Sequence, residues 1–214
     1  GKYQENEIRF RENLFKLKPK KIVNTGYFFL KYLRNTNNLN KINKSVLFAP
    51  SWNKSQKNLF ETLSIEIVQK LLDLKYHVIL RPHPELIKRN FTKYNLIKKK
   101  FRNIDNFQID NSANNNFLNK CELLITDNST IGIEFALLNF KPPIYFNLEN
   151  KIHNPNHKKI PFEAYENIFK KKFGINISSI NELSNIDKLT NEFLFNNNSY
   201  IEDLNKFESE TLYK

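Results

Sequence analysis

The stretch 122–147 constrains the fold most, because it predicts a strand, a polar turn, a helix and a second strand in immediate succession. The apolar run 123–125 is typical of a strand buried on both faces. The turn 126–130 follows, and residues 131–138 are apolar on nearly every side, which indicates a buried helix. Two prolines then end the helix, and 144–146 predicts the next strand.

The turn between that strand and that helix predicts an anion-binding site. The amino end of a helix offers unpaired N–H groups and a partial positive charge, and the hydroxyls of Ser129 and Thr130 add donors. The simpler interpretation is N-capping by Asp127, Asn128 or Ser129. Capping and phosphate binding compete, because they use the same N–H groups.

The whole chain predicts an α/β fold, a Rossmann-like parallel sheet with helices on both faces, because strands alternate with helices through short loops. The clearest strands are 45–49 and 77–80. Weaker strands are expected at 20–27 (ending in a turn at Gly26), 106–110 and 174–177, and helices at 28–34, 59–74, 114–121 and 163–172, with a basic helical stretch after residue 85 and one or two helices at the end of the chain.

The predicted domain organisation has two parts. Residues 1–44 are expected to be a connector or amino-terminal arm with a short strand and a helix, beginning with an amphipathic helix or connector at 1–20. Residues 45–214 are expected to be a Rossmann-like domain. The chain opens on Gly1 and contains no Met, so we expect it to be a piece of a longer protein.

Three polar turns each follow a predicted strand, at 50–52, 81–85 and 126–130. In parallel sheets ligands bind outside the carboxyl ends of the strands, so we expect these turns to share one site. The candidate substrate-binding residues are Ser51, Thr126, Asp127, Asn128, Ser129, Thr130 and Glu134.

Arg81 and His83 are the candidate catalytic residues. The planar fork of Arg81 suits phosphate, and the prolines on both sides of His83 stiffen its backbone. An imidazole N–H can donate to a phosphate oxygen or protonate a leaving phosphate. The alternative for His83 is a histidine at the surface or hydrogen-bonded within the core.

Glu134 lies about one and a half turns into its helix, counted from Ser129. A carboxylate on an otherwise apolar helix needs a partner. Both a ribose diol and a neighbouring Lys or Arg remain open as the partner of Glu134.

Other chemistries have weaker support. His153 and His157 have metal-ligand spacing, but Pro155 disfavours a helix between them, so we expect no metal site. Cys121 is expected in the core rather than as a nucleophile. The chain contains neither a Gly-x-Gly-x-x-Gly nor a Walker loop, which disfavours a dinucleotide oxidoreductase and a P-loop ATPase, and we expect no cofactor.

The formal charge of +12 implies acidic partners, namely phosphorylated substrates, nucleic acid or an anionic membrane. Part of the basicity can reflect the base composition of an AT-rich genome. One cysteine and no apolar run of about 20 residues predict a cytoplasmic protein, at most peripheral on the inner face of the cell membrane.

Three segments, VLFAPSW (46–52), VILRPHPE (78–85) and the stretch 122–147, resemble the carboxyl-terminal half of the CDP-glycerol:poly(glycerophosphate) glycerophosphotransferases, the teichoic-acid polymerase and primase family. Residues 25–27 are similar to that family's Thr-Gly-Tyr-Pro segment, and 162–174 is weakly similar to its Tyr-rich stretch before a glycine.

The resemblance implies the donor-binding domain of a GT-B fold, in which two Rossmann-like domains hold substrate in the cleft between them. It implies that Arg81 and His83 face the donor diphosphate, that Ser129 and Thr130 bind its phosphates, and that Glu134 meets the ribose. Asn128 stands where the family commonly has Tyr, and Glu134 where Asp is common. The family's acceptor-side base lies in the amino-terminal domain, so we expect this fragment to be inactive alone.

We therefore predict transfer of glycerol phosphate, or another polyol phosphate, from a CDP-activated donor to a cell-surface polysaccharide or teichoic-type acceptor, as in capsule polysaccharide biosynthesis. The alternative with the same fold is a UDP-sugar-dependent GT-B glycosyltransferase or non-hydrolysing 2-epimerase. A basic nucleic-acid-binding module is a third hypothesis, disfavoured because the lysines are dispersed. The expected partners are a CDP-linked donor, a lipid-linked or polysaccharide acceptor and an anionic membrane, without nucleic acid.

Overall fold

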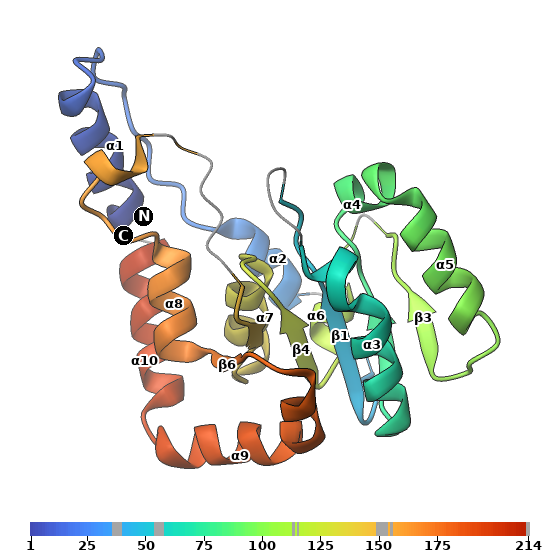
Figure 1. The fold of residues 1–214 in the computed structure, drawn as a ribbon. Coiled ribbons are helices and arrows are strands. Elements are labelled where there is room, and N and C mark those ends of the chain that lie inside the picture. The colour runs from blue at the N-terminus through green and yellow to red at the C-terminus, as the bar shows by residue number, and fades with distance from the viewer. Residues whose placement is uncertain are drawn as a thin grey trace.

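The computed structural model describes residues 1–35, 40–53, 58–112, 114, 116–148, 154 and 156–212. At the centre of the described chain lies a parallel sheet in the order β3-β2-β1-β4-β5-β6 (Figure 1). The strands are β1 (Ser45–Ala49), β2 (His77–Leu80), β3 (Phe107–Ile109), β4 (Leu123–Thr126), β5 (Ile144–Phe146) and β6 (Ile175–Ile177). The predicted Rossmann-like parallel sheet is confirmed.

Both faces of the sheet are covered, because successive side chains of a strand point to opposite sides. In β1, Val46 and Phe48 belong to one hydrophobic cluster, and Leu47 and Ala49 belong to the other. Phe48 and Leu47 have no exposed surface, and each contributes about 1.5–3 kcal/mol by its burial. The continuous apolar runs in the sequence are explained by this two-sided burial.

Different helices pack on the two faces. The first face is covered by α3 (Leu59–Asp73), α4 (Pro84–Arg89), α5 (Phe91–Phe101), the 3-10 helix η2 (Ile180–Asn185) and α9 (Ile186–Asn196). The second is covered by α2 (Phe28–Asn35), α6 (Asn116–Lys120), α7 (Ile131–Asn139), α8 (Tyr165–Phe173) and α10 (Tyr200–Phe207). The predicted arrangement of helices on both faces is therefore present.

The predicted strand at 20–27 is wrong, because these residues lie outside every helix and strand. Side chains of the preceding helix, rather than a neighbouring strand, bond to the first residue of the segment. Glu12 accepts a hydrogen bond from the backbone N–H of Lys20 at 2.7 Å, and Arg9 donates to the Lys20 carbonyl at 2.9 Å. Val23 is 69% exposed, so this apolar side chain does not pack against the sheet.

The first 20 residues contain a helix, α1 (Lys2–Leu14), which was one of the two expected forms for this segment. In Figure 1, α1 stands beside the last turns of the chain, η3 (Glu208–Leu212), and near α8. Edge-on aromatic contacts join Tyr3 to Phe162 and Tyr165, with ring centroids 6.4 and 6.2 Å apart. The two ends of the described chain therefore lie on the same side of the fold. A short 3-10 helix, η1 (His157–Lys159), precedes α8.

Candidate functional site

The strand order places the candidate site in the middle of the sheet. β1 and β4 are neighbours there, and the chain leaves them toward opposite edges, β1 toward β2 and β4 toward β5. Such a switch point opens a crevice at the carboxyl ends of the strands. A pocket of about 170 Å³ lies at this place and is called the central pocket below. Its walls are formed by Ala49, Pro50, Ser51, Arg81, Pro82, His83, Pro84, Ser129 and Ile131.

All three predicted polar turns therefore meet in one pocket. Ser51 comes from the end of β1, Arg81 and His83 from the end of β2, and Ser129 from the turn after β4. The structure brings these four predicted residues together, whereas their individual roles stay predictions.

Thr126 and Asp127 lie beneath the pocket and are 0% and 1% exposed. The Thr126 hydroxyl donates to the carbonyl of Ala49 at 2.7 Å, and Asp127 Oδ1 accepts from the backbone N–H of Ser51 at 2.9 Å. These two hydrogen bonds join the ends of β1 and β4. Their geometry suits the support of the pocket floor rather than contact with a ligand.

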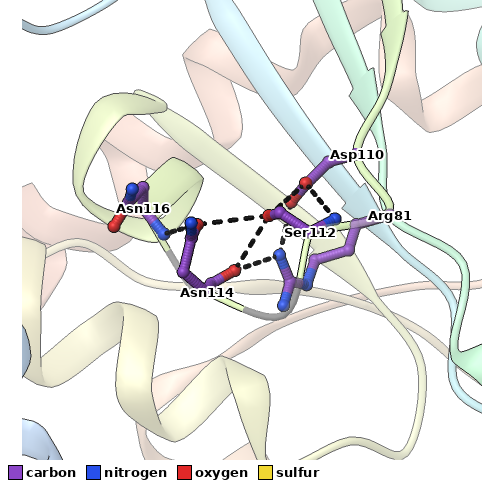
Figure 2. Close-up of polar contacts among 5 residues, drawn as sticks. All are labelled: Arg81, Asp110, Ser112, Asn114 and Asn116. Atoms are coloured by element: carbon purple, nitrogen blue, oxygen red, sulfur yellow. Dashed lines mark hydrogen bonds and ion pairs between the residues drawn. The ribbon is translucent and has the colours of Figure 1, made fainter.

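Arg81 is tied to the loop after β3 (Figure 2). Its Nη1 pairs with Asp110 Oδ2 and donates to the Asn114 carbonyl at 2.6 Å. Asp110 Oδ1 accepts from the backbone N–H of Ser112 at 2.9 Å and from its hydroxyl at 2.5 Å, and Asn116 N donates to Asn114 Oδ1 at 3.3 Å. The Asp110 and Arg81 side chains are 3% and 17% exposed, so this ion pair is largely buried. The guanidinium is thereby fixed in place at the pocket wall.

His83 begins helix α4 and caps it. Its Nδ1 accepts a hydrogen bond from the backbone N–H of Glu85 at 3.2 Å. A ring that accepts at Nδ1 carries its proton on Nε2, so this cap favours the neutral imidazole with Nε2–H as the donor. Trp52 stacks on the His83 ring at 6.4 Å between centroids, and the guanidinium of Arg89 lies 5.2 Å from the Trp52 ring centre.

The opposite wall is the start of α7, where the first two backbone N–H groups make long hydrogen bonds. Ile131 N donates to the hydroxyl oxygen of Ser129 at 3.4 Å, and Gly132 N to the Ser129 carbonyl at 3.5 Å. No side-chain hydrogen bond caps the helix at Thr130, which is exposed. Of the three capping residues considered, Ser129 accepts a hydrogen bond from an α7 N–H, at this long distance.

Gly132 has a specific reason to be in this helix. A Cβ at Gly132 would lie 2.1 Å from the hydroxyl oxygen of Tyr145, a buried residue of β5. The close approach of helix backbone to this ring fixes where the α7 start sits above the sheet.

Thr130 and Glu134 line a second hollow of about 340 Å³, called the side cavity below. The other walls come from α1, the 20–27 segment, Tyr165 and Leu212. Glu134 accepts a hydrogen bond from the Tyr27 hydroxyl. Burial raises the pKa of Glu134 above its ordinary value, while the Tyr27 hydrogen bond and the positive charge of Arg81 act in the opposite direction. The sequence left a ribose diol and a neighbouring Lys or Arg open as partners of this carboxylate. The charge of Arg81 acts on it, and nothing in the sequence indicated the hydrogen bond from Tyr27.

Lys170, on α8, was missed by the sequence analysis. It is only 9% exposed, and its Nζ lies 3.4 Å from both Asn128 Oδ1 and Asn147 Oδ1, beyond the ends of β4 and β5. Burial lowers the pKa of Lys170, and the charge of Asp127 opposes that shift. The only signal in the sequence was helical spacing, since Lys170 lies three residues before the buried Phe173.

The remaining predictions concern Cys121 and the histidine pair. Cys121 is fully buried, and burial raises the pKa of its thiol to about 12, which agrees with a core residue. His153 lies outside the described residues, so the predicted absence of a metal site at His153 and His157 stays a prediction.

A comparison with solved structures gives partial likenesses. One is a structure of the wall teichoic acid polymerase TagF, at 18% identity and a TM-score of 0.46, covering 82% of this chain and 42% of that one. A TagF variant soaked with CDPG matches at 21% identity and a TM-score of 0.47, covering 84% and 40%. A UDP-GlcNAc 2-epimerase from Methanocaldococcus jannaschii, in complex with UDP-GlcNAc and UDP, matches at 14% identity and a TM-score of 0.42, covering 77% and 42%.

The chain thus spans about two fifths of the length of these proteins. A search of curated protein sequences found no match. The family model for CDP-glycerol:poly(glycerophosphate) glycerophosphotransferase matches residues 10–209, which is nearly the whole chain and includes every candidate residue of the central pocket. The chain therefore belongs to the CDP-glycerol:poly(glycerophosphate) glycerophosphotransferase family.

Proposed function

We propose that this chain is the donor-binding half of a GT-B transferase that moves glycerol phosphate, or another polyol phosphate, from a CDP-activated donor to a teichoic-type or other cell-surface polysaccharide acceptor. The observation that carries the proposal is the central pocket, which joins Ser51, Arg81, His83 and Ser129 within the family-matched region. In this proposal residues 45–214 form the nucleotide-binding domain and 1–44 an arm.

The diphosphate of the donor binds across the central pocket. On the α7 side, the Ser129 hydroxyl and the first N–H groups of the helix donate to phosphate oxygens, because a helix start carries both unpaired donors and a partial positive charge. On the β2 side, Arg81 supplies positive charge and His83 supplies its Nε2–H. Asn128 and Thr130 flank the phosphates, and Ser51 closes the pocket floor.

The ribose lies along α7 beyond the phosphates. Glu134 follows Ser129 by five residues, which is about 7.5 Å along a helix axis. A carboxylate at that distance can accept hydrogen bonds from the two ribose hydroxyls. Glu134 is thereby the residue that distinguishes a ribonucleotide donor from its deoxy form.

The reaction is an in-line displacement at the β-phosphorus. The acceptor hydroxyl oxygen forms a bond to that phosphorus, and the bond to the oxygen that bridges the two phosphates breaks. CMP leaves with the bridging oxygen, and the hydroxyl proton goes to a base on the acceptor-binding domain. Arg81 and the Nε2–H of His83 stabilise the charge that develops on the leaving CMP. The chain alone binds the donor without turning it over.

The enzyme works on the inner face of the cell membrane, where it docks peripherally. Across the part of the chain that the structure describes, no helix has both the length and the apolar character needed to span a bilayer. Helix α5 supports docking, because Lys98, Lys99 and Lys100 are exposed together with Phe91 (61%) and Leu96 (52%). Such a mixture of cations and apolar side chains favours an anionic lipid surface.

Calorimetric titration with CDP-glycerol, CDP, CMP and a UDP-sugar tests the proposal. We expect CDP-glycerol and CDP to bind, and CMP to bind more weakly because it lacks the second phosphate. Failure of every nucleotide to bind at millimolar concentration would contradict the proposal. Tighter binding of the UDP-sugar than of CDP-glycerol would show that the donor carries uridine rather than cytidine, while the proposed binding site would stay the same.

A further inference from the structure

The hydroxyl of Tyr27 lies against Glu134 although 107 residues separate the two in the sequence. The hydroxyl donates to Glu134 Oε1, and both residues line the side cavity with Thr130 and Tyr165. Tyr27 belongs to the segment before α2, outside the sheet and its connections. This contact therefore joins the amino-terminal segment to the helix that carries the proposed nucleotide site.

The position of Tyr27 is fixed from its own side. Gly26, just before it, has a φ of 71°, a left-handed conformation that side chains disfavour, and this turn directs Tyr27 back toward α7. The Tyr27 carbonyl accepts from Leu30 N at 3.1 Å at the start of α2. Tyr27 is thus anchored to a helix rather than carried on an independent loop.

Helix α2 is in turn anchored to α7. Leu30 and Leu33 are 0% and 1% exposed and pack in the same cluster as the apolar residues of α7. Arg34 donates to the carbonyl of Leu137, in α7, at 3.0 Å. Because two packed helices hold the two partners, the Tyr27 hydroxyl and the Glu134 carboxylate have a defined separation.

We propose that Tyr27 is a positioning residue for the nucleotide: its hydroxyl holds the Glu134 carboxylate in the orientation in which it receives the ribose diol. The inference rests on the proposed function and deepens it, because it assigns part of the nucleotide site to the segment before α2.

The groups that face Glu134 come from three elements. Tyr27 donates from the segment before α2, Arg81 acts from the end of β2, and Tyr165 of α8 is close enough for the Glu134 charge to contribute to a raised tyrosine pKa. Removal of the Tyr27 hydroxyl removes one of the two influences that lower the pKa of Glu134. The pKa of Glu134 is then expected to rise.

The test compares the binding of CDP and 2′-deoxy-CDP by calorimetry in the 214-residue chain and in Tyr27→Phe. Tyr32→Phe is the matched control, because Tyr32 is on α2, 57% exposed, and stacks on Phe29. We expect Tyr27→Phe to weaken CDP about tenfold and 2′-deoxy-CDP less than about twofold, so that ribose discrimination is lost, while Tyr32→Phe changes neither.

A second readout needs no ligand. The pKa of the Glu134 carboxyl, followed by NMR, should rise in Tyr27→Phe and stay unchanged in Tyr32→Phe. A merely structural tyrosine would weaken both nucleotides equally, and that outcome overturns the inference. Equal binding of CDP and 2′-deoxy-CDP by the unmodified chain also overturns it. Absence of any nucleotide binding instead sinks the proposed function, and the inference with it.

Discussion

The two walls of the central pocket differ in how far their polar groups are already engaged. On the β2 side, Arg81 belongs to a connected network with Asp110, Ser112 and Asn114, in which the side-chain to backbone contacts are 2.6–3.2 Å long (Figure 2). On the α7 side, the N–H groups of Ile131 and Gly132 have contacts of 3.4 and 3.5 Å.

This difference indicates that the two walls have different roles in stability and in binding. A guanidinium that a buried carboxylate already holds in place loses little further conformational entropy when a ligand binds. The β2 wall therefore acts as a fixed template. The loosely bonded N–H groups of α7 can exchange their long contacts for short ones to phosphate at small cost. Stability should therefore depend on the β2 wall, and affinity on the α7 wall.

The largest expected effect is on stability, from Arg81→Ala. Loss of one partner of a buried pair leaves the buried Asp110 carboxylate without its counter-ion, which costs about 3–5 kcal/mol. Urea unfolding measures this change. Arg89→Ala is the matched control, because its ion pair with Glu85 has side chains 56% and 31% exposed and is worth at most about 1 kcal/mol. An equal loss of unfolding free energy in the two variants would show that the Arg81 ion pair stabilises the fold no more than an exposed surface pair does.

The next effect is on affinity, from Ser129→Ala. Its hydroxyl should meet a charged phosphate, so CDP binding should weaken by about 1.5–3 kcal/mol, while the free energy of unfolding changes by less than about 0.5 kcal/mol. Calorimetry and urea unfolding measure the two quantities. Ser178→Ala, beyond the end of β6, is a control that should alter neither. A loss of stability as large as the loss of affinity would erase the contrast between the walls.

The smallest effect concerns pH. The pKa of Glu134 is raised in the folded chain above its ordinary value of 4.5, chiefly by burial. Its contribution to stability is therefore present at low pH and is lost as the pH rises through the folded pKa. Glu134→Gln should remove that loss, so its stability relative to the unmodified chain should increase from pH 4.5 upward. A relative stability that falls over the same range would reverse the sign of the shift.

The strands of the sheet could be predicted because their local sequence pattern is typical of buried parallel strands. The runs 45–49 and 144–146 are short, apolar and bounded by polar or proline residues, as buried parallel strands require. The switch-point rule then grouped Ser51, Arg81, His83 and Ser129, although nothing local connects them.

The remaining features depend on contacts that a local pattern does not contain. The segment 20–27 contains the apolar pair Ile22 and Val23, but it joins no strand of the sheet, and its first residue, Lys20, bonds to side chains of α1 instead. Lys170 stands within a run of three lysines, and only the packing of α8 buries it beside Asn128. The partner of Glu134 was missed for the same reason, since Tyr27 lies 107 residues earlier.

The most direct test of the central claim is a titration of the ¹⁵N-labelled chain with CDP, followed by NMR of the backbone amides. If the diphosphate binds across the pocket and draws on the loosely held donors, the amide signals of Ile131 and Gly132 should shift most. Those signals should stay in place in the same titration with cytidine. Unmoved α7 amides during saturable binding of CDP would contradict the account.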